Sequence, residues 1–215
     1  MEISDGVYRV DGVRGANSYL AETGDGVMLV DAGLPGNADR IVAFVRALGH
    51  EASDVRMIVI THSDPDHVGS LARVKELTGA KVAVHEDDAA ALAGTGPGKK
   101  ATGVLGVVAP VILRVIGVRP VEADVILRDG DTISGFTVMH TPGHTRGSIT
   151  LHRDGVVFSG DALLADADGH ERGPRKGLSA DYPQALQSAD KIRAFGYRTL
   201  LPGHGAPVFA PTSPR

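Results

Sequence analysis

The hydrophobic and polar positions of the chain divide it into short strands and amphipathic helices. Near the N-terminus, residues 6–12 and 18–22 alternate as strands do, and residues 27–30 form a continuous apolar run. Together these three segments predict an antiparallel meander. Apolar residues spaced along one face then predict a helix over residues 38–48, with Asn37 as its N-terminal cap.

The pattern continues with strands and a helix from residue 55 to residue 85. Residues 55–60 have the composition of a strand that is buried on both faces, and residues 81–85 form another strand. Between them, a helix is predicted to open at Asp66 and His67 and to end at Gly79. Its apolar face comprises Val68, Leu71, Val74 and Leu77. This succession of strands and helices favours an α/β fold.

The second half of the chain has short apolar runs that are separated by glycine-containing turns. The predicted strands span residues 125–127, 132–133, 136–139, 148–152 and 156–158. A helix over residues 183–195, capped by Asp181, and a last strand over residues 199–201 follow. We therefore expect a single domain over residues 1–209. The tail of residues 210–215 is rich in proline and is expected to be disordered.

The most apolar stretch, residues 101–118, is close to the length of a membrane span. It falls short of the roughly 20 residues that a span needs, and it contains Pro110, Arg114 and three glycines. No integral membrane segment is therefore expected. We interpret residues of about 94–120 as an insert that forms a buried helix or a lid over an apolar substrate pocket, with its hinge at residues 94–98. The alternative is that this insert forms the interface of a homodimer.

Composition and charge restrict the candidate partners. The chain has 215 residues, of which 42% are hydrophobic and 22% are charged, as is typical of a globular protein. Its formal net charge of -4 does not favour a nucleic-acid partner, so a small-molecule substrate is expected. Residues 1–5 lack the basic and apolar regions of a signal peptide, which predicts a cytoplasmic location. Because the chain has no cysteine, any metal must be held by histidine and carboxylate side chains.

Four potential metal ligands lie within six residues, directly after the apolar strand. They are His62, Asp64, Asp66 and His67. A strand that ends in such a cluster presents it at the edge of a sheet and does not bury it in a core. A polar turn that caps a helix is the alternative interpretation, but it does not require four ligand residues in so short a segment. The cluster therefore predicts one half of a two-metal site.

Three later segments share one pattern. An apolar strand is followed by a glycine, and the glycine is followed by a residue of a type that binds metals. These residues are His144, Asp161 and His204. Glycine lets the backbone turn sharply and approach a crowded site. Each segment alone is weak support for a metal site, because histidine and aspartate beside glycine also occur in ordinary turns. Combined with the cluster after the strand, the three segments predict the remaining ligands.

From the Asp31-Ala32-Gly33 turn to Pro202-Gly203-His204-Gly205, the chain resembles the metallo-β-lactamase-fold superfamily. The resemblance implies a four-layer αββα sandwich with the site at one edge, between the two sheets. It implies that one metal is bound by His62, Asp64 and His144, that a second is bound by Asp66, His67 and His204, and that Asp161 bridges the two. It also places Asp31 near His62, as an acceptor that orients an imidazole. A simple turn-forming role for Asp31 is the alternative.

The chain departs from the common superfamily motif, His-x-His-x-Asp-His, at one ligand position. Asp64 stands where the second histidine is usual. A carboxylate is harder than an imidazole and carries a negative charge, so it shifts the metal preference towards Mn²⁺ or Fe²⁺ and makes a bound water less acidic. The expected cofactors are two divalent metal ions, with zinc as the first expectation and manganese or iron as alternatives.

The implied ligand set is that of a hydrolase. Two metal ions roughly 3.5–4 Å apart can share a hydroxide that attacks a carbonyl or phosphoryl centre, and Asp66 and Asp31 are the expected catalytic carboxylates. We expect cleavage of an ester, thioester, lactone or amide bond of a small molecule. The alternatives are an iron-dependent oxidoreductase, similar to a sulfur dioxygenase, and a non-catalytic binding module. Arg172, Arg175 and Lys176 either form a solvated loop or recognise an anionic substrate at the mouth of the site.

Overall fold

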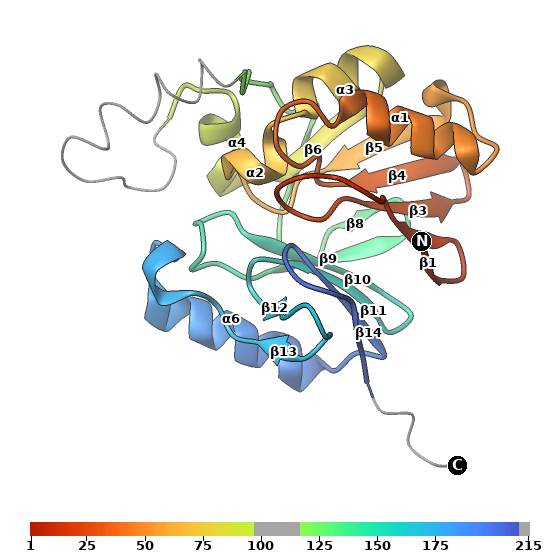
Figure 1. The fold of residues 1–215 in the computed structure, drawn as a ribbon. Helices are drawn as coiled ribbons and strands as arrows, with labels where there is room; N and C mark the ends of the chain where they lie inside the picture. The colour runs from red at the N-terminus through yellow and green to blue at the C-terminus, as the bar shows by residue number, and fades with distance from the viewer. Residues whose placement is uncertain (97–116, 211–215) are drawn as a thin grey trace.

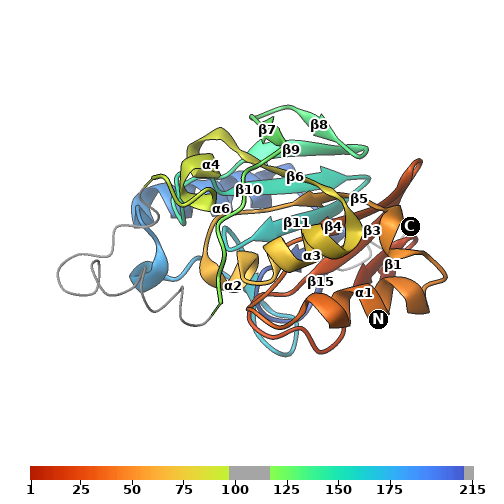
Figure 2. The same ribbon diagram turned by 90° about the horizontal axis from the view of Figure 1, so that it is seen from above.

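The computed structural model describes residues 1–96 and 117–210. Two β-sheets face each other, and helices cover their outer faces (Figures 1 and 2). Helices α1 (Ala38–Ala47) and α3 (Leu71–Thr78) lie on the first sheet, and α6 (Tyr182–Phe195) lies on the second. This arrangement confirms the predicted αββα sandwich.

The first sheet contains seven strands in the order of the sequence. They are β1 (Glu2–Ser4), β2 (Val7–Arg9), β3 (Tyr19–Thr23), β4 (Gly26–Val30), β5 (Val55–Val59), β6 (Lys81–His85) and β7 (Val125–Leu127). The strands from β1 to β4 pair antiparallel, as the predicted meander requires. From β4 to β7 the pairing is parallel, because helices connect these strands across the outer face.

The second sheet contains six strands in a mixed order, and a small two-stranded sheet accompanies it. In spatial order, the six are β15 (Val208–Phe209), β14 (Thr199–Pro202), β11 (Val156–Gly160), β10 (Ile149–Arg153), β9 (Phe136–His140) and β8 (Thr132–Ile133). Only β11 and β14 pair parallel within this sheet, and α6 connects them. The small sheet consists of β12 (Leu164–Ala165) and β13 (Glu171–Arg172).

The helix predicted to open at Asp66 is two helices, and the prediction of one continuous helix is wrong. The segment α2 (Pro65–Val68) ends at Gly69, and α3 starts two residues later. Gly69 packs directly on Pro35, where an added Cβ atom would lie 2.4 Å from the proline Cδ atom. The Ser70 hydroxyl donates to the loop that contains Pro35, through the carbonyl oxygen of Leu34 at 2.7 Å. Both contacts lie at the two residues that separate α2 from α3.

Asn37 precedes α1, but its side chain does not cap the helix as predicted. Its Nδ2 atom donates instead to the carbonyl oxygens of Arg14 and Leu34, at 2.9 and 2.8 Å. Its Oδ1 atom accepts from the Arg14 backbone N–H at 3.1 Å. The amide is thus used to join two loops, which leaves no acceptor for the first turn of the helix.

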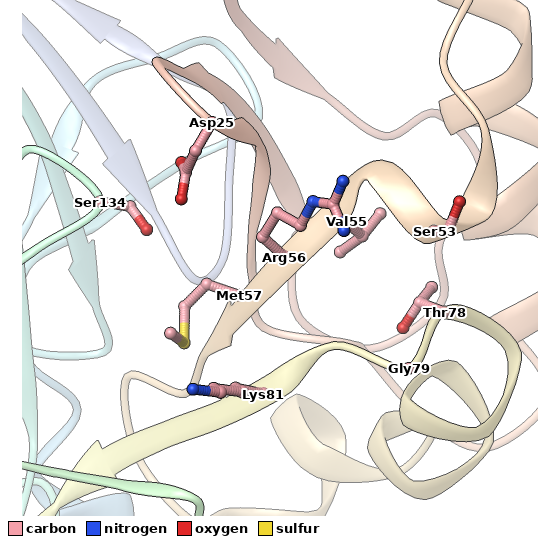
Figure 3. A pocket seen from close by; sticks show the side chains of 9 residues that line it. All are labelled: Asp25, Ser53, Val55, Arg56, Met57, Thr78, Gly79, Lys81 and Ser134. Atoms are coloured by element: carbon pink, nitrogen blue, oxygen red, sulfur yellow. The ribbon is translucent and has the colours of Figure 1, made fainter.

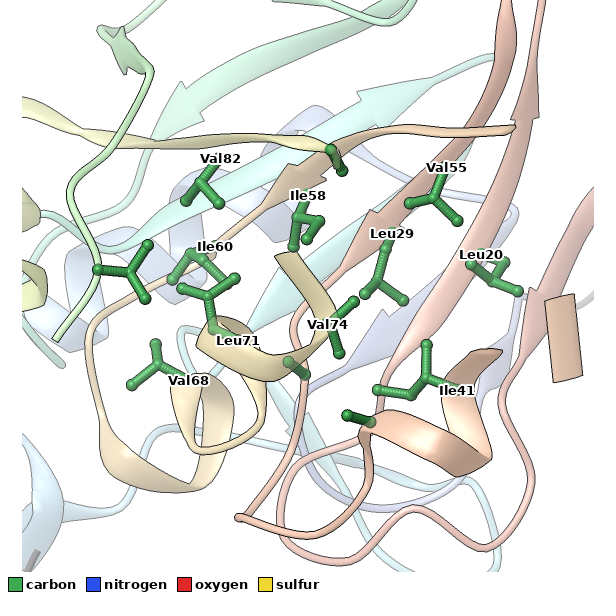
Figure 4. Packing of buried hydrophobic residues seen from close by; sticks show 14 of the residues in the cluster. Leu20, Leu29, Ile41, Val55, Ile58, Ile60, Val68, Leu71, Val74 and Val82 are labelled. Atoms are coloured by element: carbon green, nitrogen blue, oxygen red, sulfur yellow. The ribbon is translucent and has the colours of Figure 1, made fainter. Parts of the chain in front are cut away.

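Alternating side chains on the central strands build two separate hydrophobic layers. Leu29 and Ile58 point towards the helices, where they belong to a cluster with Ile41, Leu71 and Val74 (Figure 4). Their strand neighbours, such as Met28 and Val59, belong to the cluster between the two sheets, with Phe136, Leu151 and Phe158. A third cluster contains Val157, Leu200 and Ile192, between the second sheet and α6. The period of two along each strand therefore produces both layers.

Several short elements complete the described chain. Helix α4 (Glu86–Leu92), which the hydrophobic pattern did not predict, follows β6, and two 3₁₀ turns cover Ala52–Asp54 (η1) and Lys176–Leu178 (η2). The predicted lid or dimer interface lies almost entirely outside the described residues, as does the predicted disordered tail. Within the described ranges, the chain forms no helix with the length and hydropathy of a membrane span.

Candidate metal centre

The candidate site lies where several strands of both sheets end. Asp31 directly follows β4, and the His62–His67 segment begins three residues after β5. In the second sheet, His144 follows β9, Asp161 follows β11 and His204 follows β14. Each strand contributes its carboxyl end, so residues far apart in the sequence meet at one edge of the sandwich. The residues that the strand-and-glycine pattern nominated therefore lie together in the structure.

The first group of donor atoms consists of His62, Asp64 and His144. The Nε2 atom of His144 lies 3.0 Å from Oδ2 of Asp64, and Nε2 of His62 lies 3.7 Å from the same oxygen. Both histidines are buried, with side chains 3% and 1% exposed, whereas Asp64 is partly exposed. One donor atom from each residue lies within 4.8 Å of the other two, so the three can address one cation.

The second group of donor atoms consists of Asp66, His67 and His204. The Nε2 atom of His204 lies 3.2 Å from Oδ2 of Asp66. Donor atoms of all three residues again lie within 4.8 Å of one another. Helix α2 supplies two of these residues, because Asp66 and His67 lie in its single turn after Pro65. His67 is fully buried, and the other two side chains are partly exposed.

The Asp161 carboxylate lies between the two groups. Its Oδ2 atom is 3.5 Å from Nε2 of His144 in the first group and 3.5 Å from Nε2 of His204 in the second. Its Oδ1 atom is 3.4 Å from Nε2 of His67. The structure thus brings together all seven residues that the sequence nominated as ligands, and Asp161 contacts members of both groups.

Three buried polar atoms at the centre of this arrangement fit a metal ion. Within residues 1–96 and 117–210, Nε2 of His62, Nε2 of His67 and Oδ1 of Asp161 have no hydrogen-bond partner. A buried polar atom without a partner is costly, at about 1–3 kcal/mol per group. The donor atoms of these three residues lie within 4.8 Å of one another, and all three residues are buried. A divalent cation would satisfy them together.

Asp31 fixes two imidazoles, but its direct partner is not the predicted one. The expectation was His62, whereas Oδ2 of Asp31 lies 2.7 Å from Nδ1 of His67. Thr61 donates to Asp31 through both its backbone N–H (2.9 Å) and its hydroxyl (2.7 Å), so its side chain lies between the carboxylate and His62. The Thr61 hydroxyl oxygen is 3.1 Å from Nδ1 of His62 and can accept from it. The sequence analysis missed Thr61.

Buried charges at the site compensate one another. Burial alone would lower the pKa of His67, but the carboxylates of Asp31 and Asp161 raise that pKa well above its usual value. Burial opposes ionisation of Asp161 too, yet the ion pair with His67 lowers its pKa. The pKa of Asp66 is also lowered, against its burial, by the hydrogen bond to His204. Without metal, protonated His67 balances these carboxylates, and a divalent cation would take over that role.

A second cluster of histidine and aspartate does not have the geometry of a metal site. His85 stacks on His140, with ring centroids 4.0 Å apart and planes inclined by 14°. Lone pairs in parallel rings do not converge on one ion, although Asp87 also lies nearby. Nδ1 of His85 accepts from the Asp87 backbone N–H at 3.2 Å. Nε2 of His140 is within 2.8 Å of the Arg146 carbonyl oxygen.

A separate depression of about 400 Å³ lies at the other end of the strands (Figure 3). It is lined by the start of β5, including Val55, Arg56 and Met57, and by Lys81 at the start of β6. The candidate ligands follow the carboxyl ends of strands, so this depression and the candidate metal centre lie at opposite ends of the strands of the first sheet. It has no part in the site described above.

Comparison with known proteins agrees with this geometry. The family model of the metallo-beta-lactamase superfamily matches residues 11–204. The chain is 34% identical to YobT of Bacillus subtilis (strain 168) over 153 residues, which cover 68% of this chain and 61% of that protein. It is 33% identical over 209 residues to the acyl-coenzyme A thioesterase MBLAC2 of Gallus gallus, with 88% of this chain and 72% of the relative covered. The crystal structure of TTHA1623 in a di-iron-bound form has a TM-score of 0.71 and 26% identity, and the match covers 90% of this chain and 89% of that one.

The family match includes every residue of the candidate site. It begins before Asp31 and ends at His204, the last of the predicted ligands. The departure at Asp64 does not disturb the grouping, because its carboxylate occupies the first donor group beside two histidines. On these grounds of sequence, fold and site, the chain belongs to the metallo-β-lactamase superfamily.

Proposed function

We propose that the protein is a binuclear metal-dependent hydrolase that cleaves an ester or thioester bond of a small molecule, with lactones and amides as further substrate classes. The observation that carries the proposal is the position of Asp161, within 3.5 Å of a histidine in each of two donor groups. A single structural metal would need only one such group. Two groups that share a carboxylate are typical of two-metal hydrolytic sites.

In this proposal His62, Asp64 and His144 hold one divalent ion, and Asp66, His67 and His204 hold the other, with Asp161 between them. Zinc is the first expectation, and manganese or iron are alternatives because Asp64 replaces an imidazole by a harder ligand. The bound ions would supply Lewis acidity and would lower the pKa of a bound water towards neutrality. Asp66 remains ionised at neutral pH, because the hydrogen bond with His204 lowers its pKa despite its burial.

The buried carboxylate of Asp31 contributes without occupying a ligand position. By accepting from Nδ1 of His67, it leaves the lone pair of the imidazole on Nε2, which faces Asp161. The Thr61 hydroxyl has the same effect on His62, when it donates to Asp31 and accepts from Nδ1. Both histidines therefore present Nε2 to the space between the donor groups.

A thioester is the first bond to test. The support for it is the similarity to the thioesterase MBLAC2 over 88% of the chain. The decisive experiment combines metal content with substrate turnover. The protein is purified without added metal, its Zn, Mn and Fe are measured by elemental mass spectrometry, and acyl-coenzyme A thioesters, aryl esters, lactones and a chromogenic β-lactam are screened. We expect close to two metal equivalents per chain and turnover of a thioester or ester.

Two variants make this experiment specific. Asp161→Asn alters the carboxylate that contacts both donor groups, and it should lower both metal content and turnover. Asp166→Asn is the matched control, because Asp166 lies outside both groups and contacts the loop residues His170 and Arg172. Full turnover by Asp161→Asn, or a wild-type protein that takes up no metal, would rule out the proposed hydrolase.

The second candidate is an iron-dependent oxidoreductase on the same fold. One observation favours it: the carboxylate of Asp64 is a harder ligand than an imidazole and suits iron better than it suits a softer metal. This candidate predicts a single iron per chain and oxygen uptake with a thiol or persulfide substrate. Two equivalents of zinc with hydrolytic turnover and no oxygen uptake would exclude it.

A further inference from the structure

A buried aspartate outside the ligand set joins the two chain segments that carry the first donor group. Asp88 lies on α4 and is 3% exposed. Its Oδ2 atom accepts from the Ser63 backbone N–H at 2.8 Å and from the Thr145 hydroxyl at 2.9 Å. Its Oδ1 atom accepts from the Gly147 backbone N–H at 2.9 Å. One carboxylate therefore satisfies three donors, two of which are backbone groups.

The positions of these donors matter, because Ser63 and Thr145 lie next to predicted ligands and Gly147 lies three residues after His144. Ser63 stands between His62 and Asp64, and Thr145 directly follows His144. The two segments come from different sheets, after β5 and after β9. Among the described residues, one backbone hydrogen bond joins these regions, from the Ile149 N–H to the Thr61 carbonyl oxygen at 2.9 Å, and no strand pairing continues it to His144. The Asp88 carboxylate provides a direct link between them, and it does so from a third element.

The fit around Asp88 leaves little freedom for the loop after His144. An added Cβ atom at Gly147 would lie 2.6 Å from the Asp88 backbone nitrogen and 2.7 Å from its Cβ atom. Only glycine allows this approach. The Thr145 hydroxyl and backbone N–H also contact the Ser148 hydroxyl, at 2.8 and 2.9 Å, so the loop is hydrogen-bonded internally as well. The loop that presents His144 is thereby held against the start of α4.

We propose that Asp88 is a positioning residue that sets the separation between the His62–Asp64 segment and His144, and through it the affinity of the first donor group for metal. The inference rests on the proposed function for the identity of that group as a metal site. The second group has less dependence on Asp88, because His204 follows β14 and Asp88 does not contact its loop among the described residues. The two metals should therefore respond differently when Asp88 is changed.

The test uses Asp88→Asn, which keeps the size of the side chain and turns one acceptor oxygen into an N–H₂ donor. This group would then face a donor, Ser63 N–H or Gly147 N–H. In the metal-free protein, hydrogen exchange of these two amides should become at least tenfold faster. In titrations with Zn²⁺ against a chromophoric chelator, one of two binding steps should weaken at least tenfold, while the other changes less than threefold. Asp87→Asn, an exposed neighbour on α4, is the matched control and should leave both measurements unchanged.

Each outcome separates this inference from the proposed function. Unchanged exchange and unchanged affinities would refute the role of Asp88, as would equal weakening of both zinc ions, which indicates a general loss of structure. If wild-type protein binds no zinc but the two amides still exchange faster in Asp88→Asn, the proposed function fails and the link between the segments stands without its effect on metal. If Asp88→Asn does not fold, Thr145→Val removes one donor only, and a smaller weakening of the same single zinc is expected.

Discussion

The Nδ1 atom of His67 lies 2.7 Å from the Oδ2 atom of Asp31, and the two side chains are 0% and 3% exposed. A charge-assisted contact of this kind is strong where water is excluded. The same carboxylate accepts twice from Thr61, whose hydroxyl reaches His62. Asp31 thus orients one histidine from each donor group, and it adopts a left-handed backbone conformation with φ of 57° to do so.

Replacing Asp31 by asparagine should weaken metal binding by roughly 10–100-fold, the usual cost of removing a partner behind a metal ligand. Asparagine tolerates the left-handed backbone, so the change acts mainly on the acceptor oxygens. Zinc affinity, measured against a chelator, is the readout. Asp154→Asn is the control, because Asp154 also has a positive φ of 48° and lies in an exposed turn. Equal affinities in wild type and Asp31→Asn would contradict the orienting role.

Asp64→His should preserve metal binding and shift metal preference towards zinc. The imidazole restores the nitrogen ligand that is usual at this position, and it is softer than the carboxylate. The measurement is metal content after equilibration with equal concentrations of Zn²⁺, Mn²⁺ and Fe²⁺ under anaerobic conditions. An unchanged metal ratio in the variant would show that Asp64 does not determine the preference.

Removal of metal should destabilise the fold, by an amount that grows with pH. Bound metal at 100 times its Kd stabilises by about 2.7 kcal/mol, which is roughly 5–10 °C in Tm for a domain of this size. In the metal-free protein, Asp31 and Asp161 raise the pKa of His67 well above its usual value. Protonated His67 therefore stabilises the metal-free fold below the pKa of unfolded histidine, about 6.5. This contribution is lost as pH rises through the raised pKa.

The measurement is the Tm difference between metal-loaded and chelator-treated protein at several pH values from 6 to 9. The difference should increase with pH, because protons compete with metal for His67 at the lower end of the range. The variant His152→Gln is a useful control, since His152 packs beside Phe195 away from the site and its pKa is lowered by burial. A Tm difference that stays constant or shrinks with rising pH in the wild type would count against this account.

The parts of the site that could be predicted depend on residues close together in the sequence, and the parts that could not depend on contacts between distant residues. The grouping of the seven candidate ligands was predictable because each follows an apolar strand, and four of them occupy one short segment. The partner of Asp31 was predicted wrongly, because the choice between His62 and His67 depends on where the Thr61 side chain lies. Asp88 gave no signal at all, since its three donors come from two distant loops.

The fold shows the same division between local and distant information. Strand periodicity predicted most strands of the two large sheets, because it reports directly which side chains are buried, whereas their packing as a sandwich was expected from the family resemblance. The break between α2 and α3 and the failed cap at Asn37 both arise from contacts with the loop around Leu34, which only the folded chain brings together. Helix α4 was not predicted because its short, alanine-rich sequence buries only Asp88 and Leu92. The proposed lid over residues 94–120 stays a prediction.

Substrate charge can be tested at the loop between β13 and α6. This loop is fastened to the site, because the backbone N–H of Ala180 donates to the His144 carbonyl oxygen at 3.1 Å and that of Asp181 to the Gly143 carbonyl oxygen at 2.9 Å. Arg172 is paired with Asp166 at 2.7 Å, so it is not available as a substrate contact. Within the described part of the chain, neither Arg175 nor Lys176 forms a side-chain ion pair.

The double variant Arg175→Glu/Lys176→Glu should therefore raise KM for an anionic thioester such as an acyl-coenzyme A at least fivefold, and leave KM for a neutral ester within twofold. The kcat values should change little for either substrate, because these side chains are outside both donor groups. Arg172→Gln, at the end of β13 directly before this loop, is the control and should leave both KM values unchanged. An equal KM for the anionic substrate in wild type and double variant would mean that the two cations are only a solvated surface. An equal rise for both substrates would instead indicate a disturbed loop, since a lost charge contact cannot affect a neutral ester.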